Sequence, residues 1–346
     1  MSDAYAAAGV SIASSDAGVR ALVDVLRTID PGRPSRSLLG SGHYASVLRL
    51  TDDLALALST DGVGSKLVVA EQTGRLDTVG IDCIAMNVND LVCVGAEPIA
   101  MLDYLAVEQP DPAALAQIAQ GLKTGAEDAG IEIPGGELAV LPELIRGHPS
   151  PNGFDLCGAA FGTVAPDAIV TGDAIRPGDA LVGMPSSGLH SNGYTLARHA
   201  LLQDGGLGLD DAPQQLGGAT VADALLEPTV IYVRAVLELL ASAVEVHGLA
   251  HITGGGLANL LRLNEGVGFA IDAPLPVPPV FALIARLGAV PEAEMWDVFN
   301  MGCGFVAVVP DADAGAAIEL LAARHPGSAR IGTVTGRAGQ VERPGG

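Results

Sequence analysis

A glycine-rich loop that contains one of the chain's two lysines is the first segment whose residues could do chemistry. Asp61 follows the strand-like run LALALST and precedes Gly62, Gly64, Ser65 and Lys66. A carboxylate at a strand end, beside exposed backbone amides, suits a metal–phosphate site, and a lysine ammonium can contact a phosphate as a point charge. The spacing is not that of a P-loop, and Asp-Gly is a common turn pair. The segment alone therefore supports a turn and a phosphate site about equally.

A second polar set lies in the helix-like run IDCIAMNVNDLVCVGAEP at residues 81–98. Its apolar residues share one helical face, while Asp82, Asn87, Asn89 and Asp90 occupy the rest. Viewed alone, such a set is more typical of a solvent-exposed helix face. The set nevertheless consists of Asp and Asn only, whose oxygen atoms are suited to a hard cation.

A third acidic residue, Glu137, follows Gly135 and Gly136 at the end of the strand-like IEIP. A turn is again the alternative. Together with Asp61 and Asp90, Glu137 could supply the carboxylates that hold Mg²⁺ against a nucleoside triphosphate. This trio is the metal site that the sequence predicts.

In the second half, the loop SSGLHSNGY lies between a predicted strand and a predicted helix. Its backbone amides, with Ser187, Ser191 and Asn192, could bind a phosphate, and His190 could move protons near neutral pH. A polar helix-entry loop with a surface histidine is the alternative, and we favour the functional interpretation.

A further glycine run, HITGGGLANLL, enters a helix-like segment at residues 251–261. Gly254 and Gly255 are candidates for nucleotide or substrate binding through their backbone amides. Tight packing explains such glycines equally well.

The elements that must position these residues alternate between strands and helices. Helices are predicted over residues 19–29, as an amphipathic packing helix, and over 78–94, 111–130 and 226–245. A segment rich in Pro, Gly and Asp near residues 165–179 predicts a boundary between domains 1–168 and 169–346, each α+β or α/β. Further strands are predicted at 46–50, 54–60, 99–107, 131–137, 180–185, 266–272, 303–309 and 329–334, and further helices at 277–288 and 313–325.

Charge and composition exclude several classes of partner. The formal net charge of −22 opposes a nucleic-acid backbone, although a cation and backbone N–H groups can still offset the charge of a mononucleotide. The first residues lack the features of a secretory signal, and no run of about 18 apolar residues occurs. Four cysteines without C-x-x-C spacing indicate buried thiols in a reducing compartment. We therefore expect a cytoplasmic protein with neither nucleic-acid nor membrane partners.

The order and spacing of ten segments closely resemble the phosphoribosylformylglycinamidine cyclo-ligase family, the aminoimidazole ribonucleotide synthetases of purine biosynthesis. The resemblance covers nearly the whole chain, and such a series is far more specific than any single glycine motif. The segments are YAAAGV at 5–10, TDGVGSK at 60–66, TVGIDCIAMNVNDLVCVGAEP at 78–98, LDY at 102–104, GGE at 135–137, FDLCG at 154–158, SSGLHSNGY at 186–194, EPT and IY within 227–232, HITGGG at 251–256 and FNMGCG at 299–304.

The resemblance implies an enzyme that uses ATP to close formylglycinamidine ribonucleotide to aminoimidazole ribonucleotide, releasing ADP and phosphate. It implies a homodimer whose N-terminal sheets pair into a shared β-barrel, with an α/β C-terminal domain beside each half. It also implies roles at the site. Asp61, Asp90 and Glu137 would face Mg²⁺ and the ATP phosphates, assisted by Lys66, while His190, Ser191 and Asn192 would contact the substrate or transfer a proton. The residues that would line the nucleotide and substrate are Gly62, Gly64, Ser65, Asn89, Gly136, Ser187, Gly254 and Gly255.

Two segments depart from the family's pattern. The run Gly40-Ser41-Gly42-His43-Tyr44 stands where many relatives have Gly-Gly-Phe-Gly, and GGELAVLPELIRG replaces a commoner GGETAEMP pattern. Substrate contacts in these two segments stay open.

Other members of the superfamily are the alternatives, namely selenophosphate synthetase, thiamine-monophosphate kinase and a hydrogenase-maturation dehydratase. The chain lacks a cysteine before the first glycine loop and at its C-terminus, and SSGLHSNGY favours the cyclo-ligase over the kinase. A catalytically silent nucleotide-binding subunit is the alternative from a different class.

Overall fold

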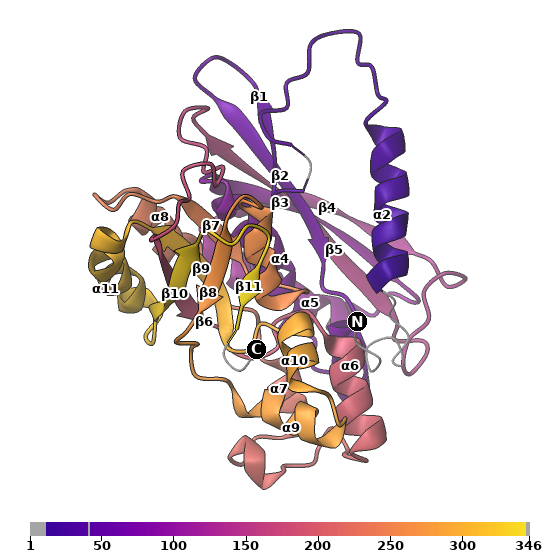
Figure 1. The fold of residues 1–346 in the computed structure, drawn as a ribbon. Coiled ribbons are helices and arrows are strands. Elements are labelled where there is room, and N and C mark those ends of the chain that lie inside the picture. The colour runs from indigo at the N-terminus through magenta and orange to yellow at the C-terminus, as the bar shows by residue number, and fades with distance from the viewer. Residues whose placement is uncertain (1–11, 41, 344–346) are drawn as a thin grey trace.

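Two β-sheets share one buried helix, α4, in the computed structural model, which describes residues 12–40 and 42–343 (Figure 1). The N-terminal sheet has the strand order β1-β2-β5-β3-β4, and the C-terminal sheet has the order β11-β8-β10-β6-β9-β7. The chain leaves the first sheet after Val164 and enters the second at Ala180. This two-sheet α/β architecture confirms the predicted fold class, while the boundary at residue 168 and the barrel shared by two chains stay predictions.

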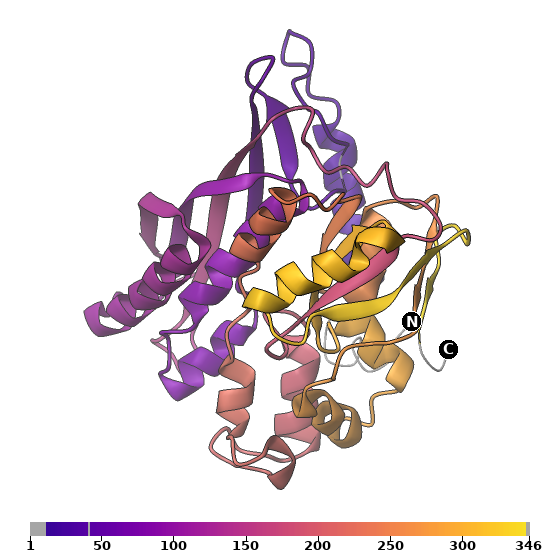
Figure 2. The ribbon, with the colours of Figure 1, turned by 90° about the vertical axis from the view of Figure 1, so that its left-hand side faces the viewer.

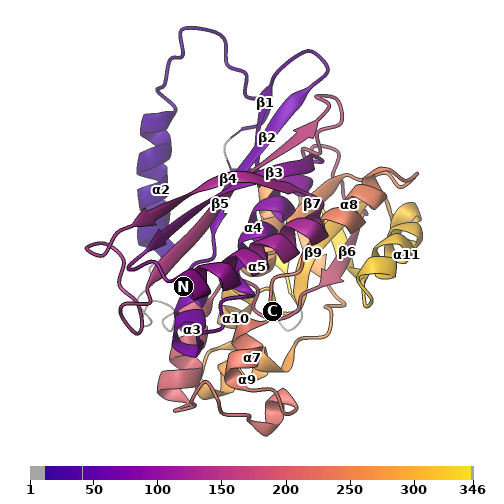
Figure 3. The same ribbon diagram turned by 180° about the vertical axis from the view of Figure 1, so that it is seen from behind.

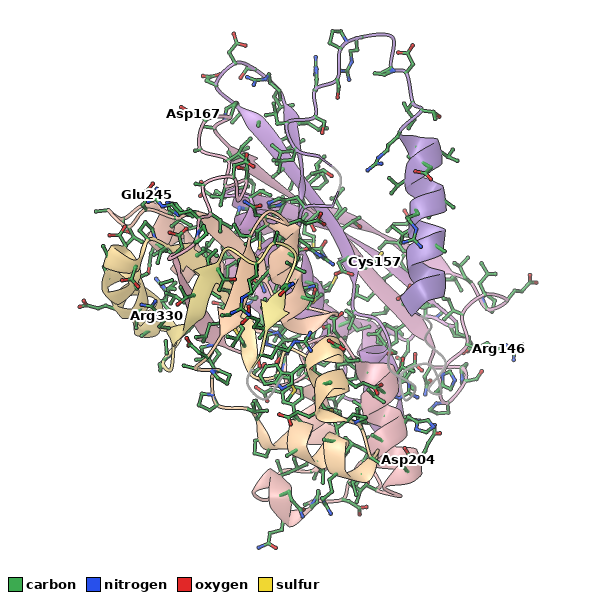
Figure 4. The ribbon with its side chains drawn as sticks, viewed as in Figure 1. Arg146, Cys157, Asp167, Asp204, Glu245 and Arg330 are labelled. Atoms are coloured by element: carbon green, nitrogen blue, oxygen red, sulfur yellow. The ribbon has the colours of Figure 1, made fainter. Side chains whose placement is uncertain are left out.

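The N-terminal sheet has one covered and one open face. Along β5, alternate residues from Phe154 to Val164 are buried, and this inner face packs on α4 and α5, which lie across the sheet in Figure 3. The opposite, outer face exposes large apolar side chains and includes Cys157, which is labelled in Figure 4. The strands are β1 Ser46–Arg49, β2 Ala55–Gly62, β3 Glu97–Val107, β4 Glu132–Val140 and β5 Phe154–Val164.

The helices of this half are α2 Ile12–Leu26, α3 Lys66–Thr73, α4 Val79–Cys93 and α5 Pro112–Ala129. The predicted cap of α5 is confirmed, because the Asp111 side chain accepts a hydrogen bond from the Ala113 amide at 2.9 Å. Glycines let α4 and α5 approach closely: a Cβ on Gly80 would lie 2.1 Å from the Leu122 nitrogen. This close contact fixes α4 against the sheet.

The C-terminal half surrounds its sheet with short helices. Helices α8 and α11 pack together beside the sheet, and α11 is the long yellow helix in Figure 2. The strands are β6 Ala180–Pro185, β7 Gly248–His251, β8 Gly268–Ile271, β9 Cys303–Val309, β10 Ala329–Thr335 and β11 Val341–Glu342. The helices are α6 Tyr194–Arg198, η1 His199–Asp204 (a π-helix), η2 Gln214–Leu216, α7 Val221–Leu226, α8 Val233–Leu240, η3 Gly256–Arg262, α9 Pro279–Leu287, α10 Glu292–Val298, η4 Asp311–Asp313 and α11 Ala314–Arg324.

Two predicted helices differ from the observed ones. The single helix expected over 226–245 is wrong, because the chain forms α7 and α8 with an extended segment between them. Helix α2 begins earlier than expected, at Ile12. Its apolar side chains from Val19 onward are not buried by the part of the chain that the structure describes: Leu22 is 66% exposed and Leu26 is 58% exposed.

The described residues agree with two simpler predictions. All four cysteines are free thiols, three of them buried and Cys157 partly buried. Over residues 12–40 and 42–343, no helix has the length and apolar character needed to cross a membrane.

Candidate active site

A row of paired residues across the N-terminal sheet places two carboxylates on its inner face. Asp61 on β2 pairs with Gly158 on β5, Gly158 pairs with Asp103 on β3, and Asp103 pairs with Gly136 on β4. Paired residues share a face of the sheet, so Asp61 and Asp103 both point towards α4. The glycines leave room for them, because a Cβ on Gly136 would lie 2.2 Å from Asp103 Oδ1.

A third carboxylate, Asp90, approaches from α4. Its Oδ1 lies 2.9 Å from Nδ1 of His251, the last residue of β7, so the acidic cluster lies where the two halves meet. Burial raises the pKa of Asp61, and the negative charge of Asp90 raises this pKa further, while the Gly62 amide and Arg262 oppose the shift. Burial also raises the pKa of Asp103. Asp61 and Asp90 are therefore close enough to interact, and burial disfavours the charged forms of Asp61 and Asp103.

The predicted glycine loop meets the loops of the second half beside these carboxylates. Ser65 Oγ lies 3.3 Å from Thr195 Oγ1, and a Cβ on Gly64 would lie 3.9 Å from the Ser191 carbonyl oxygen. Gly64 is exposed and has φ of +74°, a conformation that side chains disfavour. Its backbone is thus open to a ligand at the seam between the halves.

The predicted glycine run 253–256 lies across the same seam. Asn192 Oδ1 would be 3.2 Å from a Cβ on Gly254, and Gly255 has φ of +97°. The buried Asn192 Nδ2 has no hydrogen-bond partner within the described residues, so it can still donate to a ligand. Asn192, Gly254 and Gly255 therefore come together as expected, and their contact with nucleotide or substrate stays a prediction.

Lys66 lies under the seam rather than in it. Its side chain is fully buried, and Nζ bonds to Asp82 at 2.7 Å, to the Glu227 carbonyl at 2.6 Å and to the His190 carbonyl at 3.3 Å. All three ammonium donors are used, so a phosphate contact, which stays a prediction, would require this network to open. In the observed conformation, Lys66 holds the N-terminal half to two loops of the C-terminal half.

His190 is also buried, with only 1% of its surface exposed. Its Nε2 accepts a hydrogen bond from the Ser187 amide at 3.3 Å, and Nδ1 has no partner among the described residues. Burial lowers the pKa of His190 well below its usual range, and the nearby Lys66 charge lowers it further. The neutral ring packs beside Tyr232, so proton transfer to substrate stays a prediction that needs local opening.

The polar residues of α4 are not a solvated helix face, and that interpretation is wrong. Asp82, Asn87 and Asn89 are completely buried. Asn89 accepts a hydrogen bond from the Tyr232 amide at 2.9 Å and donates to the Val230 carbonyl at 2.9 Å. These side chains tie α4 to both halves, and a direct contact of Asn89 with a ligand stays a prediction.

The hydroxyls of Ser187 and Ser191 also form hydrogen bonds within the protein. Ser187 Oγ donates to the Pro228 carbonyl at 2.5 Å, and Ser191 Oγ lies 3.3 Å from Thr229 Oγ1. Their hydroxyls position the loop, so their predicted ligand contacts would have to come from the backbone or from a rearranged loop.

Glu137 is not brought to Asp61 and Asp90 within one chain. It pairs with Tyr104, whose side chain is 40% exposed on the outer face of the sheet, and Glu137 itself is exposed. Gly136 takes the inner-face position on β4 beside Asp103 instead. The role of Glu137 as a third metal ligand therefore stays a prediction.

Two residues that the sequence reasoning did not single out lie in the cluster. Asp103 belongs to the segment LDY and His251 begins HITGGG, both of which carried the resemblance. Asp103 was interpreted only as part of the predicted strand 99–107, and His251 only as the first residue of the glycine run. The spacing of LDY after α4 was the available signal for Asp103, whereas only the fold brings His251 to Asp90.

The donor set fits magnesium bound together with phosphates. Among the described residues, no three His, Cys, Asp or Glu side chains are arranged to hold a metal by themselves. Magnesium commonly takes only one or two protein carboxylates and completes its octahedral shell with phosphate oxygens and water. Asp61, Asp90 and Asp103 match that chemistry.

Comparison with known proteins agrees with this architecture. Residues 42–164 match the model of the AIR synthase related protein N-terminal domain, and residues 176–343 match that of the AIR synthase related protein C-terminal domain. The phosphoribosylformylglycinamidine cyclo-ligase of Thermococcus kodakarensis is 50% identical over 97% of this chain and 96% of that protein. The protein of the same name from Pyrococcus furiosus is 48% identical, again over 97% of this chain and 96% of that protein.

Solved structures share the fold at lower identity. The thiamine-monophosphate kinase of Stenotrophomonas maltophilia superposes with a TM-score of 0.62 and 23% identity, covering 88% of this chain and 91% of that chain. The hydrogenase maturation protein HypE in complex with ATP has a TM-score of 0.59 and 23% identity, covering 89% of this chain and 86% of that chain.

Proposed function

The chain belongs to the AIR synthase related protein family, and from this premise we propose that it is an ATP-dependent cyclo-ligase. Its substrate is formylglycinamidine ribonucleotide, and its products are aminoimidazole ribonucleotide, ADP and phosphate. The observation that carries the proposal is the 50% identity to the Thermococcus kodakarensis cyclo-ligase over 97% of the chain.

The reaction needs the formamide oxygen to become a leaving group. The formamide oxygen attacks the γ-phosphorus, the bond to the β-phosphate oxygen breaks, and ADP leaves with that electron pair. The amidine nitrogen then attacks the activated formyl carbon within the same molecule, phosphate departs with the former oxygen, and the nitrogen loses a proton. Charge neutralisation and positioning are therefore the main tasks of the protein.

The carboxylate cluster is suited to those tasks. Mg²⁺, when bound, neutralises the charge that develops on the transferring phosphoryl group. We propose Asp61 and Asp90 as its protein ligands, Asp103 as a further acidic neighbour, and the backbone at Gly62, Gly64, Gly254 and Gly255 as the cradle of the phosphates. His251 would keep the Asp90 carboxylate oriented through the bond between Nδ1 and Oδ1.

A cytoplasmic homodimer completes the proposal. The outer face of the N-terminal sheet exposes two large apolar side chains, as expected of a surface that a partner covers. A symmetric dimer would bury this face in both copies. The two side chains are Leu102 and Tyr104, which pair with Ala159 and Cys157 of β5 and are 41% and 40% exposed.

An ADP-release assay coupled to NADH oxidation tests the activity. We expect Mg–ATP turnover with formylglycinamidine ribonucleotide and none with thiamine monophosphate or selenide. ADP release with either control compound, but not with the ribonucleotide, would overturn the assignment. Binding of Mg–ATP without any ADP release would instead identify a non-catalytic nucleotide-binding subunit.

Substitution of one carboxylate tests the proposed magnesium ligands. We expect Asp61→Asn to lower turnover at least ~100-fold, because a transition-state charge loses its counterion, while the circular dichroism spectrum stays unchanged. Isothermal titration should also show weaker Mg–ATP binding. Asp210→Asn, which changes an exposed carboxylate in the loop before α7, should behave like the wild type. Full activity of Asp61→Asn would remove this residue from the site.

A further inference from the structure

Helix α2 presents an apolar stripe that none of the described residues, 12–40 and 42–343, covers. Val19, Leu22, Leu26 and Ile29, just beyond the helix end, are 58–67% exposed. Their spacing of three and four residues places them on one helical face. Figures 1 and 3 show α2 standing apart from the sheets and from the other helices.

A helix of this kind is not stable by itself in water. Isolated helices of about 12–15 residues are marginal, and most helical stability in proteins comes from packing of the apolar face. Helix α2 has 15 residues, Ile12–Leu26, and Gly18 lies in its middle. Its own composition therefore calls for a packing partner.

Charge indicates which partner that is. Residues 17–36, which we call the arm, carry four arginines and two aspartates, a net charge of +2 in a chain whose formal net charge is −22. The strands of the N-terminal sheet carry exposed acidic side chains. These are Glu97, Glu132, Glu137 and Asp155. A second copy of this chain thus offers both uncovered apolar surface and the complementary charge.

We propose that the arm crosses to a second copy and packs its apolar stripe on the N-terminal half of that copy. Under two-fold symmetry, each protomer gives one arm and receives one, so both stripes are covered by the same interaction. The arginines of the arm lie near acidic residues of the receiving N-terminal half. The inference rests on the proposed homodimer and adds to it an exchanged element that a pairing of sheets alone does not require.

Photo-crosslinking distinguishes the second copy from the same chain. Two full-length copies with different affinity tags are co-expressed, one of them carrying Leu22→benzoylphenylalanine, and the mixed dimer is purified through both tags. After irradiation, we expect a covalent product that contains both tags, with its crosslinked peptide within residues 42–164 of the unmodified copy. Asp24→benzoylphenylalanine, on the opposite face of α2, should give several-fold less product.

Any other crosslinking result contradicts the proposal that the arm crosses to a second copy. Crosslinks confined to one chain, or a purified dimer with no crosslink from position 22, would remove the arm from the interface while leaving the homodimer proposal intact. Recovery of single chains only by light scattering would reject the dimer itself, whereas the ADP-release assay reports separately on the activity. If the protein floated with phosphatidylserine vesicles only when the arm was present, and no crosslinked product formed, the partner of the arm would be a membrane surface instead.

The strength of association supplies a second readout. Leu22→Asp should raise the dimer dissociation constant at least tenfold in sedimentation velocity, because a carboxylate would be placed in the covered stripe. Asp24→Ala should leave that constant within about twofold of the wild type. Equal constants for all three proteins would contradict the proposal.

Discussion

At the scale of single residues, the inner face of the N-terminal sheet depends on which positions have no side chain. Gly136 occupies the β4 position next to Asp103, and Gly158 separates Asp103 from Asp61 on the paired strand. A Cβ on Gly158 would lie 2.5 Å from the Met101 sulfur, so the buried Met101 side chain would have to move to admit one. The glycines are thus part of how the carboxylates are held.

Gly136→Ala should therefore damage the site. The added methyl would meet Asp103 Oδ1 at 2.2 Å, and the carboxylate would have to move. We expect kcat/KM to fall more than tenfold, with the melting temperature little changed because the position is exposed. Gly135→Ala is the matched control, since nothing lies within 4 Å of its added Cβ. Equal activity of the two variants would show that the Asp103 position does not matter.

His190 makes the stability of the protein depend on pH. Burial keeps its pKa well below 6.5 in the folded state, whereas the unfolded chain binds the proton near pH 6.5. The free energy of unfolding is therefore not reduced by His190 above pH 6.5, where the ring is neutral in both states. Below pH 6.5 the unfolded chain takes up the proton that the buried ring excludes, and the free energy of unfolding falls by up to ~1.4 kcal/mol per pH unit. Urea unfolding at pH 7, 6 and 5 should show this slope.

His190→Asn should make that slope shallower, because it removes the titrating group. Asn tolerates the left-handed backbone of this position, where φ is +62°. His148→Asn, whose side chain is 63% exposed in the wild type, should leave the slope unchanged. A slope that is identical in all three proteins would place the acid sensitivity elsewhere, for example at His43 or His325, whose pKa values burial also lowers.

The residue-level predictions from sequence were best where chemistry and local order coincide. Asp61, Gly64 and Ser65 were placed at a strand end beside a glycine loop, and that is where they lie. The sequence could not show that Lys66 turns inward, because its partners Asp82, Glu227 and His190 are distant in the chain. Only the packed fold decides between an open and a buried ammonium.

At the scale of elements, α4 connects the site to both halves. Its apolar residues pack on the N-terminal sheet, and its polar residues bind segments of the C-terminal half. The predicted limits, 78–94, agree with the observed Val79–Cys93 because a regular apolar period and Gly95 mark them.

The segment 226–245 shows where local periodicity fails. Its apolar spacing favours one helix, yet Pro228 comes two residues after the end of α7. The Thr229 amide donates to Asp82 at 2.8 Å instead of continuing a helix. A long-range hydrogen bond thus outweighs the local preference. No pattern within the segment indicates this bond.

The close contact of α4 with α5 gives a prediction for Gly80. In Gly80→Ala, the added Cβ would lie 2.1 Å from the Leu122 nitrogen, so the two helices must separate. We expect a loss of ~2–4 kcal/mol in the free energy of unfolding, measured with urea, and reduced activity because Asp90 moves with α4. Gly315→Ala on α11 is the control: its Cβ would meet nothing within 4 Å, and it should gain ~0.5–1 kcal/mol. Similar effects of the two substitutions would contradict this account of the packing.

At the scale of the whole molecule, a buried polar network joins the two halves. Lys66 and Asp82 belong to the N-terminal half, while Glu227, Thr229 and His190 belong to the C-terminal half. Asp82 Oδ1 accepts from the Thr229 hydroxyl at 2.6 Å as well as from Lys66. Because buried charges are tolerated only when paired and hydrogen-bonded, this network specifies how the halves sit against each other and hence the seam above it.

The chain's two lysines allow a direct test of that coupling. Lys66→Met would leave Asp82 buried without its countercharge, and we expect a loss of ~3–5 kcal/mol in the free energy of unfolding. Lys123→Met removes a lysine whose side chain is 61% exposed and paired with Glu127, four residues along the same helix, so its effect should stay within ~0.5 kcal/mol. Circular dichroism reports on the whole chain, and the single tryptophan, Trp296, reports on the C-terminal half. The two signals should change together in the wild type and separately in Lys66→Met, because the halves no longer unfold as one unit. Coincident transitions with unchanged stability would mean that the apolar contacts of α4 alone join the halves.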